Sequence, residues 1–379
     1  MPNSKYVVKK IIILHVRFIK MYGDKMKKLF WLIQIIILIA LTTNVLPQNV
    51  RPVRDNIGFC WNADEMDLFI EYLTNHYNET NFSAENLVAG IVPHDDFLYS
   101  GTVSFPLFKM IKTKEVVIFG VTHGTVRRAV KDPQNVLILD NFDKWTGAYG
   151  NIEISPLREL IKQNLNPNYY IVNDSAQILE HSIESLLPYL QHYNPGIKIT
   201  SIMVTKTPFD KMEKMSDELT GIITKYISDN NLKLGEDIFF LFSNDCNHYS
   251  PDFNNSPYGT GAAGHKEATD NDRRIADECF NGTIDKTRIT KFTEELWPEL
   301  GKAEHPPLWC GRYPITLGLL TITKVVNQIA GKQLSGQVVK YSDTFTEMVL
   351  PVKGTSMGIT APFSLEHWVG FLSVGFYVE

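Results

Sequence analysis

Cysteine is scarce in this chain of 379 residues. The four cysteines are far apart and form no CxxC pair: Cys60, Cys246, Cys279 and Cys310. This scarcity excludes a zinc ribbon and a disulfide scaffold as the basis of the fold. The body of the chain also lacks a long basic run, and the formal net charge is -5. We therefore expect no general nucleic-acid-binding surface.

Long apolar runs are also missing, except near the amino terminus. There, Leu29 to Leu41 is largely apolar and directly follows two lysines. A short basic start before such a run is typical of a secretory signal, and the run is short for a spanning helix. We therefore predict that residues 1–49 are a signal peptide for periplasmic or secreted export. The alternative is an uncleaved anchor, through which alone the protein would contact a membrane. Met21 and Met26 are candidates for the true start.

Internal repeats and low-complexity tracts are absent from the rest of the chain, so residues 50–379 are expected to form a single domain. Continuous apolar runs at 87–92, 115–121 and 238–242 predict strands that are buried on both faces. Segments of helical period alternate with them, which predicts a mainly parallel or mixed sheet covered by helices. The expected helices include 63–77, 102–111, 174–190, 209–228, 271–279 and 310–329, and the expected later strands are 197–204, 337–341, 346–350 and 370–377.

Polar side chains that suit metal binding or proton transfer follow three of the predicted strands. His94 comes after the first, His123 after the second, and Asp245 and His248 after the strand at 238–242. If these strands are parallel, their ends meet at one edge of the sheet and the side chains converge. The alternative for each histidine taken singly is a hydrogen bond that caps a strand end.

Two further residues belong to this pattern. Cys310 opens a predicted helix, whose field is expected to lower the pKa of the thiol and favour the thiolate. The alternative is a small buried hydrophobic residue. His181 is expected on a helix beside Glu180 and Glu184, and the alternative there is an ordinary pair on the helix surface. Two or three imidazoles with a thiolate or carboxylate would suit iron, copper or zinc.

Five motifs resemble those of the Memo family, also called AmmeMemoRadiSam system protein B. In chain order they are VPHDDFLYSG at 92–101, GVTH at 120–123, EHSIE with LPYL at 180–190, SNDCNHY at 243–249 and CGRYPI at 310–315. The family is similar in fold to the class III extradiol dioxygenases, which are non-haem iron enzymes. The resemblance implies a three-layer αβα sandwich. Within the motifs, Asp95 and Asp96 replace the family's Ala-Gly, and Gly124 replaces a second histidine.

The resemblance implies metal ligands at His94, His123 and Cys310. It places Asp245, His248 and His181 in the same cleft, where we expect them to act on the substrate. Iron or copper is expected, with zinc as a further candidate, because a thiolate makes the site soft. The predicted function is an oxidation, of dioxygenase type or another, on an unidentified small molecule. The alternatives are a non-catalytic metal- or peptide-binding protein and a metal-dependent hydrolase, because a fold does not fix function.

Overall fold

The computed structural model describes residues 28, 31, 48–77 and 82–379. The predictions for residues 1–49 therefore fall almost wholly outside the described residues, and export and anchoring both stay predictions. In the part of the chain that is described, no helix is long and apolar enough to cross a membrane. Residues Asn49–Glu379 form one compact unit.

Thirteen strands of the described residues form one mixed sheet. They are β1 (Val50–Arg51), β2 (Leu87–Val92), β3 (Glu115–Gly120), β4 (Leu137–Leu139), β5 (Lys144–Trp145), β6 (Ile152–Ile154), β7 (Tyr170–Val172), β8 (Lys198–Val204), β9 (Ile238–Ser243), β10 (Asp245–Tyr249), β11 (Gly282–Ile284), β12 (Leu334–Asp343) and β13 (Trp368–Val378). The main path runs β1-β5-β6-β8-β3-β9-β2-β13-β12-β11. Strands β8, β3, β9 and β2 are parallel to one another, whereas β13 pairs antiparallel with both β2 and β12.

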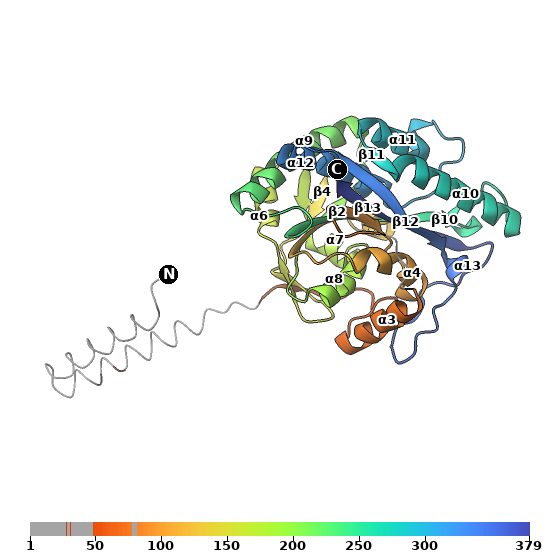
Figure 1. Cartoon of the computed structure of the whole chain (residues 1–379), viewed down its shortest axis with the longest axis horizontal. Coiled ribbons are helices and arrows are strands. Elements are labelled where there is room, and N and C mark those ends of the chain that lie inside the picture. The colour runs from red at the N-terminus through yellow and green to blue at the C-terminus, as the bar shows by residue number, and fades with distance from the viewer. Residues whose placement is uncertain (1–27, 29–30, 32–47, 78–81) are drawn as a thin grey trace. The chain divides into compact units, whose positions relative to one another are not determined.

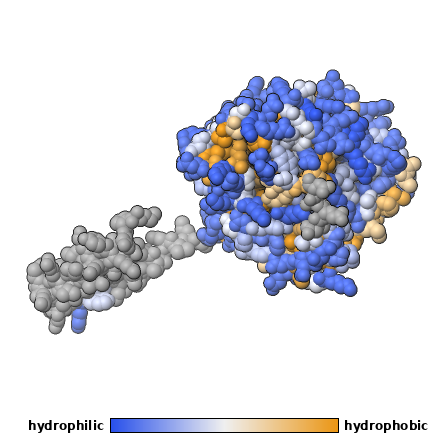
Figure 2. Space-filling model, in the orientation of Figure 1, coloured by the Kyte–Doolittle hydropathy of each residue, from blue (hydrophilic) through white to orange (hydrophobic). Residues whose placement is uncertain are grey.

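Helices cover both faces of this sheet (Figure 1). They are α3 (Ala63–His76), α4 (Phe97–Phe108), α5 (Gly124–Ala129), α6 (Leu157–Asn164), α7 (Asp174–Leu179), α8 (Leu187–Tyr193), α9 (Phe209–Asp229), α10 (Gly261–Phe280), α11 (Lys286–Leu296), α12 (Arg312–Ala330) and α13 (Thr344–Glu347). Helices α9, α10, α11 and α12 lie on one side, and α3, α4 and α8 lie on the other. The αβα sandwich is therefore confirmed. On the face shown in Figure 2 most residues are hydrophilic, and the apolar ones gather in separate patches.

Strand β9 shows why an unbroken apolar run marks the middle of such a sheet. It lies between β3 and β2, and all its residues are buried. Successive side chains point to opposite faces of a strand. Phe240 and Phe242 accordingly join the core cluster under α9 and α12, while Phe239 and Leu241 join the cluster under α3, α4 and α8. Both faces of β9 therefore require apolar residues.

The predicted helix at 174–190 is interrupted. Helix α7 ends at Leu179, residues 180–183 are not helical, and a 3-10 turn at Glu184–Leu186 leads into α8. The Glu180 carboxylate accepts hydrogen bonds from the backbone N–H groups of His181 and Ser182. Such local side-chain bonds compete with helical ones and stop the helix.

The predicted strand at 346–350 is wrong. Asp343 instead accepts hydrogen bonds from the backbone N–H groups of Phe345 and Thr346 and thereby caps the short helix α13. Met348 then has a φ of 58°, which ends any regular structure. An aspartate that can cap a helix outweighs the apolar Met-Val-Leu run that follows it.

Candidate metal centre

Three parallel strands bring the centre together. In the sheet, Val92 at the end of β2 pairs with Ser243 of β9, and Phe119 of β3 pairs with Phe242. The carboxyl ends of β2, β3 and β9 therefore lie side by side at one edge of the sheet. The segments that follow them carry His94, His123 and Asp245, as the sequence pattern predicts.

Cys310 reaches this edge from a different direction. It lies just before α12, and its backbone N–H donates a hydrogen bond of 3.1 Å to the carbonyl of Asp245. The backbone N–H of Asp245 in turn lies 3.2 Å from the Cys310 Sγ atom. This two-way contact fixes the loop that carries the thiol to the end of β9.

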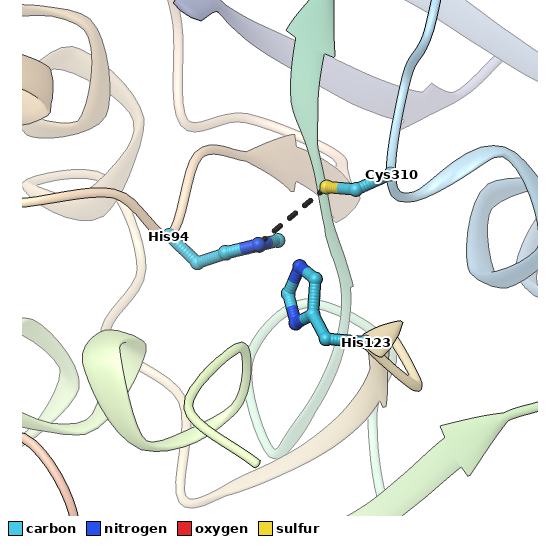
Figure 3. Close-up of side chains that lie close together, drawn as sticks. All are labelled: His94, His123 and Cys310. Carbon is cyan, nitrogen blue, oxygen red and sulfur yellow. Dashed lines mark hydrogen bonds between the residues drawn. The ribbon is translucent and has the colours of Figure 1, made fainter. Parts of the chain in front are cut away.

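His94, His123 and Cys310 point toward one another (Figure 3). The Nε2 atom of His94 lies 3.5 Å from the Sγ atom of Cys310. One ligand atom from each of the three residues lies within 4.8 Å of the other two. Imidazole nitrogen and cysteine sulfur are the donors that first-row transition metals commonly take.

The His94 ring is oriented from behind by Ser243. The Nδ1 atom of His94 lies 2.7 Å from the Ser243 Oγ atom, and that hydroxyl donates to the carbonyl of Ser182 over 2.5 Å. Because its own proton is directed to Ser182, the Ser243 oxygen accepts from His94 Nδ1–H. The Nε2 lone pair of His94 is then left free for a metal.

The His123 ring is oriented by Glu180, a buried carboxylate. Its Nδ1 atom lies 2.7 Å from the Glu180 Oε1 atom. Although burial opposes the charge, Glu180 raises the pKa of His123 above its ordinary value. The pKa of Glu180 itself lies well below the usual range. Burial acts to raise this pKa, but the charge of His123 outweighs burial and lowers it. Glu180 also accepts three backbone N–H groups, so it serves better as a support for His123 than as a ligand.

The expected low pKa of Cys310 is wrong. Burial raises the pKa of the thiol well above its ordinary range, and the Asp245 carboxylate raises it further. The position at a helix start does not compensate, because burial removes the water that would stabilise a thiolate. A metal that binds Cys310 must therefore displace a proton.

Asp245 sits directly beside the candidate ligands. Its Oδ1 atom accepts the backbone N–H of His94 at 2.9 Å, and its Oδ2 atom lies 3.3 Å from His94 Nε2. Burial raises the pKa of Asp245 to about 7. Burial and the neighbouring Asp245 also raise the pKa of Asp95 well above its ordinary value. Two close, buried carboxyl groups cannot both ionise freely, so this pair retains a proton near neutral pH.

His248 offers a neutral imidazole. Its Nδ1 atom lies 3.1 Å from the carbonyl oxygen of Cys246 and 3.2 Å from that of Leu308, so Nδ1 carries the proton. Burial, followed by the charge of His123, lowers the pKa of His248 to about 4. Ligand atoms of Asp245, His248 and Cys310 also lie within 4.8 Å of one another.

The expected helical position of His181 is wrong, because the residue lies between α7 and α8. The structure nevertheless brings His181 to the centre. Its ring stacks on that of His123 with 4.6 Å between ring centroids, and it lies 5.5 Å from the ring of His94. Burial and the charge of His123 lower the pKa of His181 to about 3, so this ring is neutral at pH 7.

Glu184 is not a surface residue and does not face the cluster. It is fully buried and pairs with Arg51, and it also accepts the backbone N–H groups of Arg54 and Asp55. Its carboxylate fixes the segment at the start of the compact unit. With these partners, the Glu184 carboxylate is occupied and is not available to the cluster.

A pocket of about 290 Å³ opens beside the candidate ligands. His123, His248 and Cys310 form part of its wall. Phe253 and Leu308 contribute apolar surface. The pocket therefore gives a small molecule access to the same atoms that would hold a metal.

The sequence pattern does not identify Ser243 and Glu180 as the partners that orient His94 and His123. Ser243 ends an apolar strand and Glu180 precedes a histidine, but serine and glutamate are common at such places. The contact between Ser243 and His94 joins residues 149 positions apart. Spacing along the chain carries no signal for such a pair.

A family model described as "Memo-like protein" matches residues 58–348. Proteins described as "MEMO1 family protein" are similar to this chain. One from Aquifex aeolicus is 28% identical over 42% of this chain and 54% of its own length. Another, from Pyrobaculum arsenaticum, is 26% identical over 44% of this chain and 55% of its own length. The chain thus spans little more than half the length of these two relatives. The protein from Desulfurococcus amylolyticus is 24% identical over 79% of this chain and 86% of its own length.

Proposed function

Because this chain belongs to the family of Memo-like proteins, we propose that it binds one transition-metal ion through His94, His123 and Cys310. The ion would serve in the oxidation of a small substrate. One observation carries this proposal: two imidazole nitrogens and a thiol converge within 4.8 Å, and both rings have their other nitrogen engaged. Such outer hydrogen bonds are typical of histidines that ligate metals.

The donor set fits a borderline or soft first-row ion. Two imidazoles suit iron, copper and zinc, and the sulfur of Cys310 favours the softer ions. Iron or copper is therefore our first choice, with zinc as the alternative. When bound, iron or copper would supply one-electron redox chemistry.

The neighbouring side chains would handle protons and position the substrate. Asp245, whose pKa is raised to about 7 by burial, can hold or accept a proton at Oδ2 near neutral pH. His248, whose pKa is about 4, presents a neutral Nε2 atom that accepts a hydrogen bond. His181 would contribute a second neutral ring above His123.

A metal-dependent hydrolase is the second candidate, and the raised pKa of Asp245 favours it. A buried carboxylate that titrates near 7 is a suitable base for taking a proton from water. A hydrolase does not require a redox ion, so zinc would serve. In that case Cys310 would matter less than the imidazoles and Asp245.

Metal analysis of protein purified without added metal tests the site. We expect about one equivalent of iron or copper in the native protein and its loss in His94→Ala and His123→Ala. His76→Ala is the matched control, because this exposed histidine of α3 lies outside the cluster. If none of the proteins binds iron, copper or zinc after reconstitution, the metal site is refuted.

Cys310→Ser separates the two chemistries. Under the redox proposal, the variant loses its iron or copper together with oxygen consumption on candidate catechols. Under the hydrolase proposal, it retains zinc and hydrolytic activity. Metal binding without turnover by either assay would identify a non-catalytic metal-binding protein.

A further inference from the structure

The pocket beside the candidate ligands carries an excess of positive charge. Three cationic side chains line it, and each comes from a different segment: Arg127 from α5, Lys206 from the loop after β8, and Arg312 from the start of α12. No aspartate or glutamate is among the described residues that line it. This contrasts with the chain as a whole, whose formal net charge is -5.

Neighbouring groups neutralise these cations only in part. Within the described part of the chain, Arg127 has no ion-pair partner. Lys206 lies 3.5 Å from Glu299, a loose contact between two partly exposed side chains. Among the ion pairs of the described residues, this is the one that involves any of the three cations. The nearby Glu180 and Asp245 carboxylates are engaged by His123 and by the backbone N–H of His94.

Arg312 is held in place while part of its hydrogen-bonding capacity stays unused. It donates from Nη1 to the carbonyl of Trp309 at 2.7 Å, and its guanidinium lies 5.2 Å from the ring centre of Tyr313. Its Nε atom is buried without a hydrogen-bond partner. The guanidinium is thereby positioned at the pocket wall, and no ion pair of the described residues neutralises it.

Apolar side chains make up part of the remaining lining, beside Thr122, Tyr313 and the candidate site residues. Val121, Val204, Leu308 and Phe253 surround the cations, and the volume of about 290 Å³ is at the small end for a ligand site. Small size and apolar walls favour a compact organic body over a peptide chain. Guanidinium groups bind carboxylate and phosphate oxygens through paired, charge-assisted hydrogen bonds.

We propose that this pocket binds a small organic anion, with a carboxylate or phosphate held by Arg127, Lys206 and Arg312 and an apolar body directed toward the candidate metal ligands. The inference rests on the proposed function, because it names the substrate class of that same centre. It requires no new reaction step. The cations select and orient the molecule on which the centre acts.

Titration calorimetry with three probes tests the inference: benzoate, phenyl phosphate and the neutral benzamide. We expect at least one anion to bind about tenfold or more tightly than benzamide, and binding to weaken as salt is added. The tighter of the two anions identifies the head group. Equal affinity for benzamide, or no saturable anion binding in the millimolar range, overturns the inference.

The variant to test is Arg127→Gln combined with Lys206→Gln, since both side chains line the pocket, neither is fully buried and neither is a candidate ligand. We expect it to lose about tenfold or more in anion affinity. Arg128→Gln is the matched control, because Arg128 is exposed, contacts Thr125 and does not line the pocket. It should change anion affinity less than about twofold. Unchanged anion affinity in a double variant with a normal melting temperature refutes the assignment.

Metal content measured on the same samples separates this inference from the proposed function. A normal metal content with no preference for anions refutes the anion pocket alone. Anion binding that depends on Arg127 and Lys206, in a protein that takes up no metal, refutes the metal proposal and leaves the anion pocket standing.

Discussion

At the scale of single residues, the candidate centre depends on groups that form hydrogen bonds with the Nδ1 atoms of its imidazoles. His94 is fixed by Ser243, His123 by Glu180, and His248 by two backbone carbonyls. Each contact engages Nδ1, so Nε2 is the nitrogen that each ring can offer to a metal. A metal would therefore meet rings that are already oriented, which reduces the entropy lost on binding.

Ser243→Ala should weaken metal binding by about 10- to 100-fold, because it removes the acceptor that fixes the tautomer of His94. Ser373→Ala is the matched control: this serine is also buried in a strand, but its Oγ atom has no hydrogen-bond partner. Metal affinity is measured against a competing chelator, and Ser243→Thr should restore much of it. Equal affinity in Ser243→Ala and native protein would show that the hydroxyl does not act on the site.

The sequence predicts the positions of the candidate residues better than their ionisation. His94, His123 and Asp245 follow apolar runs that are parallel strands, so topology alone brings them together. The pKa of Cys310 depends instead on burial among segments far apart in the chain. The local sequence shows that a helix starts near Cys310, but it does not show that the thiol is buried. Burial has the larger effect on the pKa of this thiol.

At the scale of elements, β9 and α12 meet through a glycine. Gly318 lies within α12, and a Cβ atom added to it would come 2.2 Å from Cε1 of Phe242. Phe242 is fully buried in β9, one residue before Ser243. The missing side chain lets the helix approach the strand that supports the centre.

Gly318→Ala should therefore destabilise the protein by about 1–3 kcal/mol, because the rigid ring and the packed core must shift. Gly221→Ala is the matched control in α9, where an added Cβ would meet nothing within 4 Å. That change should stabilise the protein by about 0.5–1 kcal/mol, since alanine favours a helix over glycine. Denaturant unfolding measures both, and effects of equal sign would contradict the packing argument.

The type of an element is predicted correctly where the period of its apolar residues decides it. The prediction fails where a polar side chain forms hydrogen bonds that interrupt the element. The strands β2, β3 and β9 follow directly from their apolar runs. The break at residues 180–183 comes from Glu180, which bonds to nearby backbone and to His123 at once. That second partner is supplied by tertiary structure, so the local pattern still resembles a continuous helix.

At the scale of the whole molecule, one buried ion pair fixes the start of the compact unit to its middle. Arg51 pairs with Glu184, which is 133 positions away, and also donates to the carbonyls of Gln177 and Glu180. Its guanidinium lies 4.2 Å from the ring centre of Trp145. The Glu184 carboxylate in turn holds the segment that carries Arg54 and Asp55, whose charges act on His181 of the candidate centre.

Arg51→Met should lower the free energy of unfolding by about 3–5 kcal/mol at neutral pH, because it leaves Glu184 buried and unpaired. Burial already raises the pKa of Glu184, and Arg51 counteracts this. Without Arg51 the folded-state pKa rises further, so stability is retained below the unfolded value of 4.5 and is lost as pH rises above it. The deficit should therefore be larger at pH 7.5 than at pH 5.

Thermal unfolding of Arg51→Met across this pH range checks the prediction. Lys225→Met is the control, because Lys225 forms an exposed pair with Asp229 on one helix and should change stability by less than about 0.5 kcal/mol. A deficit for Arg51→Met that is independent of pH would show that Glu184 is not the responsible group.

The place of β13 in the sheet has a consequence for how the protein is made. This strand spans Trp368–Val378 but lies inside the sheet, where Val374 pairs with Ile91 of β2 on one side and with Val338 of β12 on the other. A ribosome delivers β2 long before β13, so β2 has an open edge while most of the chain is being synthesised. Closure of the sheet therefore waits for the last strand. Until then, the open edge of β2 can pair with another chain, which favours aggregation of the incomplete protein.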